Sequence, residues 1–123
     1  MSAAPDTAAT RHVAAVLAQH GMADRLKALA ATARSAEEAA ASLGVAVEAI
    51  VKTLIFEYIP ENGPLAGEVM PLAVLISGDR RCLTGAIPDV LGLGGKVRRP
   101  DAARVKDLTG YSIGGVSPVG LNE

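Results

Sequence analysis

The chain has 123 residues and a formal net charge of −1. This length suits one domain and is too short for two, and the near-neutral charge argues against a nucleic-acid binder held by bulk electrostatics. Half of the residues are hydrophobic, but there is no Trp, one Phe and two Tyr, which argues against base stacking as the main binding mode. Cys82 is the only cysteine, so an internal disulfide is excluded. We expect a cytoplasmic protein with one aliphatic core and no membrane segment.

The N-terminal third predicts two helices. Residues 1–9 are expected to form a frayed tail, and residues 10–123 a single domain. Apolar residues at helical spacing predict a helix over Thr10–Gln19 that ends at Gly21. An edge strand over Arg25–Leu29 is one interpretation of the ambiguous stretch that follows. Ser35 then provides an N-cap, and Glu38 completes a capping box for a helix over Ala36–Leu43.

The middle of the chain predicts a β-hairpin. Residues Ile50–Tyr58 have the β-branched and aromatic content of a strand, and Val69–Ile76 form a second apolar run. The Pro, Asn and Gly between them indicate a turn, so the two strands should pair in antiparallel fashion. The second run is apolar enough to predict a central strand that is covered on both faces.

The last third alternates short elements. We expect a strand or turn over residues 82–86, a helix over Ile87–Leu93 and a strand over Lys96–Arg98. Pro100 is expected in the first turn of a helix over Asp101–Leu108 that ends before Gly110. Irregular alternation with one hairpin predicts an α+β fold with a mixed, largely antiparallel curved sheet and packed helices.

Lys52 is the first candidate for chemistry, because it interrupts the apolar run of the first strand. It is either a strand residue that faces water or a cation aimed at a phosphate or at an oxygen that gains charge. Ser77, Gly78 and Asp79 with Arg80 and Arg81 end the second strand. They form either a surface turn closed by Asp79 or the lining of a pocket, with an arginine near a phosphate.

Two further segments have both a structural and a functional interpretation. The basic run from Lys96 to Lys106, which includes Arg98 and Arg99, is either a solvated face or a local patch for an RNA backbone. The segment Thr109–Gly120 holds Gly114, Gly115 and Pro118. It either connects elements or lets a ligand approach bare backbone N–H groups. The sequence shows no clustered metal ligands and no Ser-His-Asp pattern, so we expect no cofactor and no metal.

These segments together resemble the YbaK/ProX family of free-standing aminoacyl-tRNA deacylases and synthetase editing domains. The resemblance is carried, in chain order, by the Ser35 helix start, the strand with Lys52, the Ser77–Arg81 corner and the Thr109–Gly120 loop. It implies hydrolysis of the ester between a wrong amino acid and the terminal adenosine of a tRNA, commonly alanine or cysteine on a proline tRNA. The alternative is a non-catalytic module of the same fold that binds tRNA ends or a synthetase.

The resemblance also implies roles for individual residues. Lys52 matches the family's pocket lysine, and Gly114–Pro118, with Ser117, match its Gly-x-x-x-Pro loop. Backbone N–H groups at Gly114 and Gly115 would serve the developing oxyanion. Ser77, Gly78 and Asp79 match pocket residues at the strand end, while Arg80, Arg81, Arg98 and Arg99 are expected to bind RNA.

The resemblance implies partners for this protein, and the chain departs from the family pattern at two places. The expected partner is the aminoacylated acceptor end of a tRNA, with prolyl-tRNA synthetase as a candidate protein partner. Leu121 stands where the family usually has a polar residue. Family members continue for some tens of residues beyond the position of Glu123, so we expect a fold that is shortened at its C-terminus. The chain is either a fragment or a shortened gene product that compensates by self-association.

Overall fold

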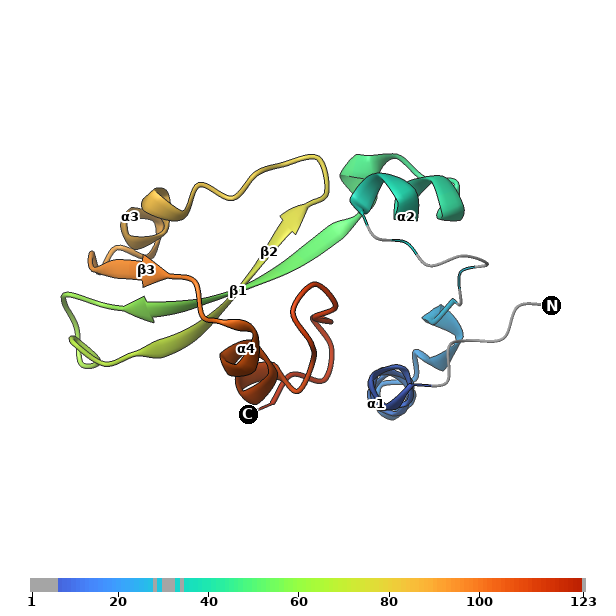
Figure 1. Ribbon diagram of the computed structural model, residues 1–123, viewed down its shortest axis with the longest axis horizontal. Helices are drawn as coiled ribbons and strands as arrows, with labels where there is room; N and C mark the ends of the chain where they lie inside the picture. The colour runs from blue at the N-terminus through green and yellow to red at the C-terminus, as the bar shows by residue number, and fades with distance from the viewer. Residues whose placement is uncertain (1–6, 28, 30–32, 34, 123) are drawn as a thin grey trace.

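The computed structural model describes residues 7–27, 29, 33 and 35–122. Its centre is a three-stranded antiparallel sheet in the order β2-β1-β3. β1 (Val51–Ile59) and β2 (Met70–Ser77) pair along almost their whole length, whereas β3 (Lys96–Arg98) pairs only with Glu57–Ile59. Figure 1 shows the β1–β2 hairpin as the long twisted axis of the molecule, with β3 beside one end. The α+β class and the hairpin are therefore confirmed.

One prediction about the sheet is wrong. Among the described residues, β2 lies at one edge of the sheet and β1 is the central strand. The burial of β2 alternates: Leu72, Val74 and Ile76 are partly buried, while Ala73 and Leu75 are exposed. The unbroken apolar run of β2 predicts burial on both faces, but the described part of the chain covers one face of β2 better than the other. Only alternate side chains are therefore partly buried.

Helix α2 (Ala36–Leu43) forms as its caps predict. The Ser35 hydroxyl accepts a hydrogen bond from the Glu38 backbone N–H at 3.1 Å, and Gly44 ends the helix in the left-handed conformation. The short 3₁₀ turn η2 (Val47–Ala49) leads directly into β1. These two elements cover the end of the hairpin where β1 begins (Figure 1).

Helix α1 (Ala8–Gln19) starts two residues before its predicted boundary, and His20 is its C-cap. Its described side chains are all exposed or half-buried. The His12 ring lies 2.8 Å, through Nε2, from the carbonyl oxygen of Gly120, so this histidine holds α1 against the C-terminal loop rather than being only solvated. The predicted edge strand is wrong for the described residues of Arg25–Leu29, since η1 (Ala23–Arg25) is a 3₁₀ turn and its successors are not extended into a sheet.

The last third contains η3 (Thr84–Ala86), α3 (Ile87–Leu91) and α4 (Ala102–Thr109). Helix α3 ends at Gly92, earlier than predicted. Asp101 is the N-cap of α4, and its carboxylate accepts from the Arg104 N–H at 2.8 Å, so Pro100 precedes the helix instead of lying in its first turn. Gly110 ends α4 as predicted.

The core of the described region is small and lies where β1, β3 and α4 meet. The buried apolar side chains there are few: Phe56 and Tyr58 from β1, Val105 from α4 and Tyr111 after it, while Ala40 is the buried residue of α2. The described residues contain no helix long and apolar enough to cross a membrane.

Candidate functional site

The candidate site consists of two adjoining depressions on either side of β1. The Lys52 hollow is an open depression of about 570 Å³, and the β1 cavity is smaller, about 150 Å³. Leu54 and Arg99 line both. The Lys52 hollow is lined by Glu37, Lys52, Leu54, Gly78, Asp79, Arg80, Arg81, Cys82, Thr84 and Arg99. The β1 cavity is lined by Thr53, Leu54, Ile55, Phe56, Arg99, Pro100, Val105, Ile113 and Val116.

The Lys52 hollow brings the lysine together with Gly78, Asp79, Arg80 and Arg81 of the strand-end corner, whereas Ser77 does not line it. The Lys52 ammonium donates to the Arg80 carbonyl oxygen at 2.7 Å. This bond fixes the ammonium near the start of β1 and leaves two of its three N–H donors for a ligand. Lys52 is half-buried, so its charge is less screened than that of a fully exposed lysine.

The corner after β2 is closed by a network around Ser77. The Ser77 hydroxyl lies 2.7 Å from both the Glu48 carbonyl oxygen and Asp79 Oδ1, so its single proton is shared between two acceptors. Gly78 is buried, and its N–H donates to the Ile50 carbonyl oxygen at 2.6 Å. These contacts make the corner a rigid support for the hollow. The Asp79 carboxylate thus accepts a hydrogen bond from the Ser77 hydroxyl, and Asp79 also lines the Lys52 hollow.

The electrostatics of the Lys52 hollow favour an anion. Lys52, Arg80, Arg81 and Arg99 line it, against the carboxylates of Glu37 and Asp79. Arg99 lies with its guanidinium carbon 6.0 Å from the centre of the buried Phe56 ring, which holds the cation in place without neutralising it. A chain of near-zero net charge therefore carries a local excess of positive charge at this point.

Arg98 is engaged elsewhere. Its Nε lies 3.5 Å from one oxygen of the buried Glu57 carboxylate, while Arg104 Nε lies 3.4 Å from the other. Arg98 does not line the Lys52 hollow. Unlike Arg80, Arg81 and Arg99, Arg98 therefore lies outside the Lys52 hollow, and it joins β3 to β1 through Glu57.

The glycine-proline loop does not reach Lys52. Gly114 and Gly115 are exposed and line neither the Lys52 hollow nor the β1 cavity. The Gly115 N–H donates to the Ser112 carbonyl oxygen at 2.9 Å, so it is not available to an oxyanion. The Ser117 hydroxyl accepts from the Val119 N–H at 3.0 Å, and Pro118 is exposed. The expected single hollow shared by Lys52 and bare glycine amides is thus absent from the described region.

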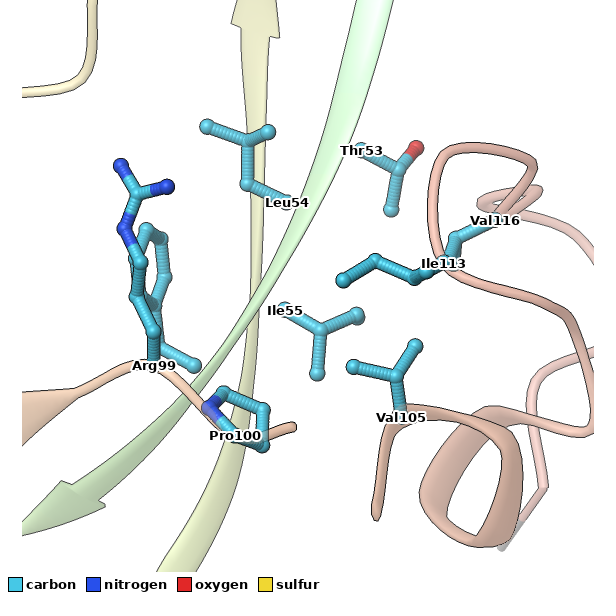
Figure 2. Close-up of a pocket in the computed structure, with 9 residues that line it drawn as sticks. Thr53, Leu54, Ile55, Arg99, Pro100, Val105, Ile113 and Val116 are labelled. Atoms are coloured by element: carbon cyan, nitrogen blue, oxygen red, sulfur yellow. The ribbon is translucent and has the colours of Figure 1, made fainter. Parts of the chain in front are cut away.

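The loop instead contributes two aliphatic side chains to the β1 cavity. Figure 2 shows Ile113 and Val116 directed toward Thr53 and Ile55, with Leu54 and Arg99 on the other side of the β1 ribbon. Thr53 is a residue that sequence reasoning missed. Its hydroxyl oxygen is buried and has no hydrogen-bond partner among the described residues. Strand alternation around Lys52 is the one signal that places Thr53 on the opposite face.

The described residues include no group of three or more His, Cys, Asp or Glu side chains placed to hold a metal ion. Free Cys82 is half-buried and lines the Lys52 hollow. The arrangement can therefore bind an anion in one depression and a small apolar group in the next, with Arg99 and Leu54 between them.

A family model described as the aminoacyl-tRNA editing domain matches residues 30–123. No curated protein matches the chain.

Three solved structures are similar to the chain. A candidate trans-editing enzyme for prolyl-tRNA synthetase is 35% identical with a TM-score of 0.75, over 97% of this chain and 69% of that one. A scaffold protein used for epitope grafting by computational design is 33% identical with a TM-score of 0.73, over 94% and 68%. The hypothetical protein APE2540 is 35% identical with a TM-score of 0.71, over 90% and 67%. The chain thus spans about two thirds of each of these proteins, and it belongs to the aminoacyl-tRNA editing domain family, the YbaK/ProX family.

Proposed function

We propose that this protein hydrolyses mischarged aminoacyl-tRNA, with Lys52 at the centre of the site. The observation that carries the proposal is the Lys52 hollow, because it combines a fixed ammonium and three arginines in a member of an editing family. The phosphate and ribose of a terminal nucleotide are the groups that such a hollow attracts. The neighbouring β1 cavity is apolar and small, as an aminoacyl side chain requires.

The chemistry needs little from side chains. Water attacks the ester carbonyl carbon and the bond to the ribose oxygen breaks. One proton of the water goes to the released ribose oxygen, and the other goes to solvent as the carboxylate forms. An aminoacyl ester is already activated, so orientation and charge stabilisation are the main requirements. Lys52 is placed to stabilise negative charge that develops on the ribose or phosphate oxygens. A side-chain nucleophile is not required.

Alanine or cysteine on a proline tRNA is the first substrate pair to examine, and prolyl-tRNA synthetase is the protein partner to examine. The amino acids are those that the resemblance to the family implies, and the synthetase is the one that the description of a similar structure names. The second candidate function is tRNA-end binding without turnover. It is favoured by the lining of the Lys52 hollow, which includes neither Gly114 nor Gly115.

The direct test is single-turnover deacylation of tRNAs that carry alanine, cysteine or proline. Replacing Lys52→Ala should slow hydrolysis of the sensitive ester about 100-fold or more, the range measured when one charge-stabilising donor is removed. Lys27→Ala is the matched control, because Lys27 is exposed and lines neither depression. Equal rates for wild type and Lys52→Ala would show that the assigned site is wrong. Binding of tRNA with no turnover would favour the second function.

A further inference from the structure

A third depression, the Glu57 depression, lies where the end of β1, β3 and the start of α4 meet. It is open and has a volume of about 620 Å³. Its charged lining residues are Glu57, Arg98, Arg99, Asp101 and Arg104. Three guanidinium groups therefore face two carboxylates, and two of the three, those of Arg98 and Arg104, line neither the Lys52 hollow nor the β1 cavity.

Glu57 is the fixed centre of this depression. Its side chain is only 10% exposed, and Glu57 pairs with Arg98 in the register of β1 and β3. One carboxylate oxygen lies 3.5 Å from Arg98 Nε, and the other lies 3.4 Å from Arg104 Nε. Charge-assisted contacts to one buried carboxylate restrict both side chains to one arrangement. The two arginines are therefore ordered before a ligand arrives, which lowers the entropy that binding would cost.

Both arginines keep donors for a ligand. Each contacts Glu57 through Nε, so the terminal amino groups of the two guanidiniums have no partner among the described residues. The side chains of Arg98 and Arg104 are 57% and 47% exposed. The Asp101 carboxylate accepts from the Arg104 backbone N–H at 2.8 Å, as an N-cap does. Because two guanidiniums share one carboxylate, the pair retains one uncompensated positive charge.

Arg99 connects the Glu57 depression to the Lys52 hollow, because it lines both. Its guanidinium lies over the Phe56 ring, and no carboxylate in the described part of the chain forms an ion pair with it. A nucleic-acid strand carries one phosphate for each nucleotide. A strand whose last nucleotide lies in the Lys52 hollow would therefore bring its preceding phosphate close to Arg99 and the neighbouring depression.

We propose that the Glu57 depression binds the phosphodiester that precedes the terminal nucleotide of a single-stranded RNA end. Arg98 and Arg104 donate to its non-bridging oxygens through their terminal amino groups, and Glu57 holds the two guanidiniums in place. Planar guanidinium forks match the geometry of a phosphate. No aromatic side chain lines the depression within the described region, so a phosphate fits it better than a stacked base. The assignment rests on the proposed function, because it takes the terminal nucleotide to lie in the Lys52 hollow.

The test compares two RNA probes that carry no ester to hydrolyse: CpA, which has one phosphodiester, and CpCpA, which has two. The wild type should bind CpCpA about tenfold more tightly at low salt, the scale of a hydrogen bond to a charged group. Arg104→Ala should remove most of this gain and leave the affinity for CpA unchanged. Arg25→Ala is the control, since Arg25 is exposed and lines none of the three depressions.

A second variant separates binding from a loss of structure. Glu57→Gln removes one negative charge from the depression, so CpCpA should bind about fivefold more tightly, the effect of one unit charge at contact distance in water. Glu57→Gln and Arg104→Ala both break a contact of the buried carboxylate, so both should unfold at a lower temperature than the wild type. Opposite changes in affinity from two destabilised variants cannot come from partial unfolding.

The affinity ratio of the two probes is the readout of choice. Arg98 and Arg104 share Glu57, so replacing either one should change the salt dependence of binding less than replacing an arginine that has no carboxylate partner. The ratio also cancels any change in binding of the terminal nucleotide itself, because both probes end in the same adenosine.

The outcomes separate this proposal from the proposed function. Equal affinity of the wild type for CpA and CpCpA, or the same gain in Arg104→Ala as in the wild type, would overturn the phosphate site. Loss of binding to prolyl-tRNA synthetase by Arg104→Ala, with unchanged affinity for CpCpA, would also overturn it, since the depression would then bind a protein. A gain that depends on Arg104, in a protein that hydrolyses no aminoacyl ester, would support the site and count against the deacylase.

Discussion

At the scale of single residues, Gly78 shows how tightly the strand-end corner is built. A Cβ at this position would lie 2.9 Å from both the Ala36 Cβ and the Val47 carbonyl oxygen. Gly78→Ala should therefore lower the free energy of unfolding by about 1–3 kcal/mol, the usual cost of overpacking. Urea unfolding of the wild type and the variant measures this difference in the free energy of unfolding. Gly85→Ala is the control, because a Cβ there meets nothing within 4 Å, and an equal loss in both variants would contradict the assigned contact.

The same residue bears on function. The sequence suggested that Gly78 binds substrate, and it does line the Lys52 hollow. Its backbone N–H, however, is already bonded to Ile50, and its missing side chain lets η2 and α2 approach. We therefore expect Gly78 to position Lys52 and Asp79 by fixing the corner, so that its substitution affects stability before it affects ligand contact.

At the scale of elements, the buried Glu57 carboxylate joins β1 to β3 and α4. Its side chain is 10% exposed and pairs with Arg98 and Arg104, which are about half exposed. Glu57→Gln should destabilise the protein by about 1–2 kcal/mol, less than a fully buried pair because both arginines still reach water. Thermal unfolding is the measurement, with exposed Glu48→Gln as the control. No difference between the two variants would show that the pairs contribute nothing.

Element prediction succeeded where local signals decide the outcome. The caps of α2 at Ser35 and Gly44, the end of α4 at Gly110 and the hairpin all follow from short sequence patterns. It failed for the place of β2 in the sheet, because strand order depends on which segments pair across long sequence distances. The strand suggested over Arg25–Leu29 is wrong for its described residues for a related reason: its local preference is weak, and no strand in the described part of the chain pairs with it.

At the scale of the whole molecule, the positive charge is local. Binding of a tRNA acceptor end should weaken with salt, and Arg81→Ala should reduce the slope of log affinity against log salt by about 0.7, the value for one phosphate contact to a single strand. Arg98→Ala should change the slope less, because Glu57 holds its guanidinium. Arg25→Ala, far from the Lys52 hollow in η1, is the charge-matched control. Equal slopes for Arg81→Ala and Arg25→Ala would remove Arg81 from the RNA contact.

The sequence alone determined the α+β class, the family and the cluster around Lys52, because these depend on local patterns of strand, cap and turn residues. The sequence could not determine which segment of the chain packs on which face of β1. Only the tertiary structure placed Ile113 and Val116 of the Gly114 loop beside Thr53 and Ile55, on the face of β1 opposite Lys52, and paired Arg98 with Glu57. The physical reason is that a strand has two faces and two edges, and alternation assigns its side chains to the faces. Which segment packs on each face is decided by contacts between residues far apart in the sequence, and no local pattern encodes those contacts.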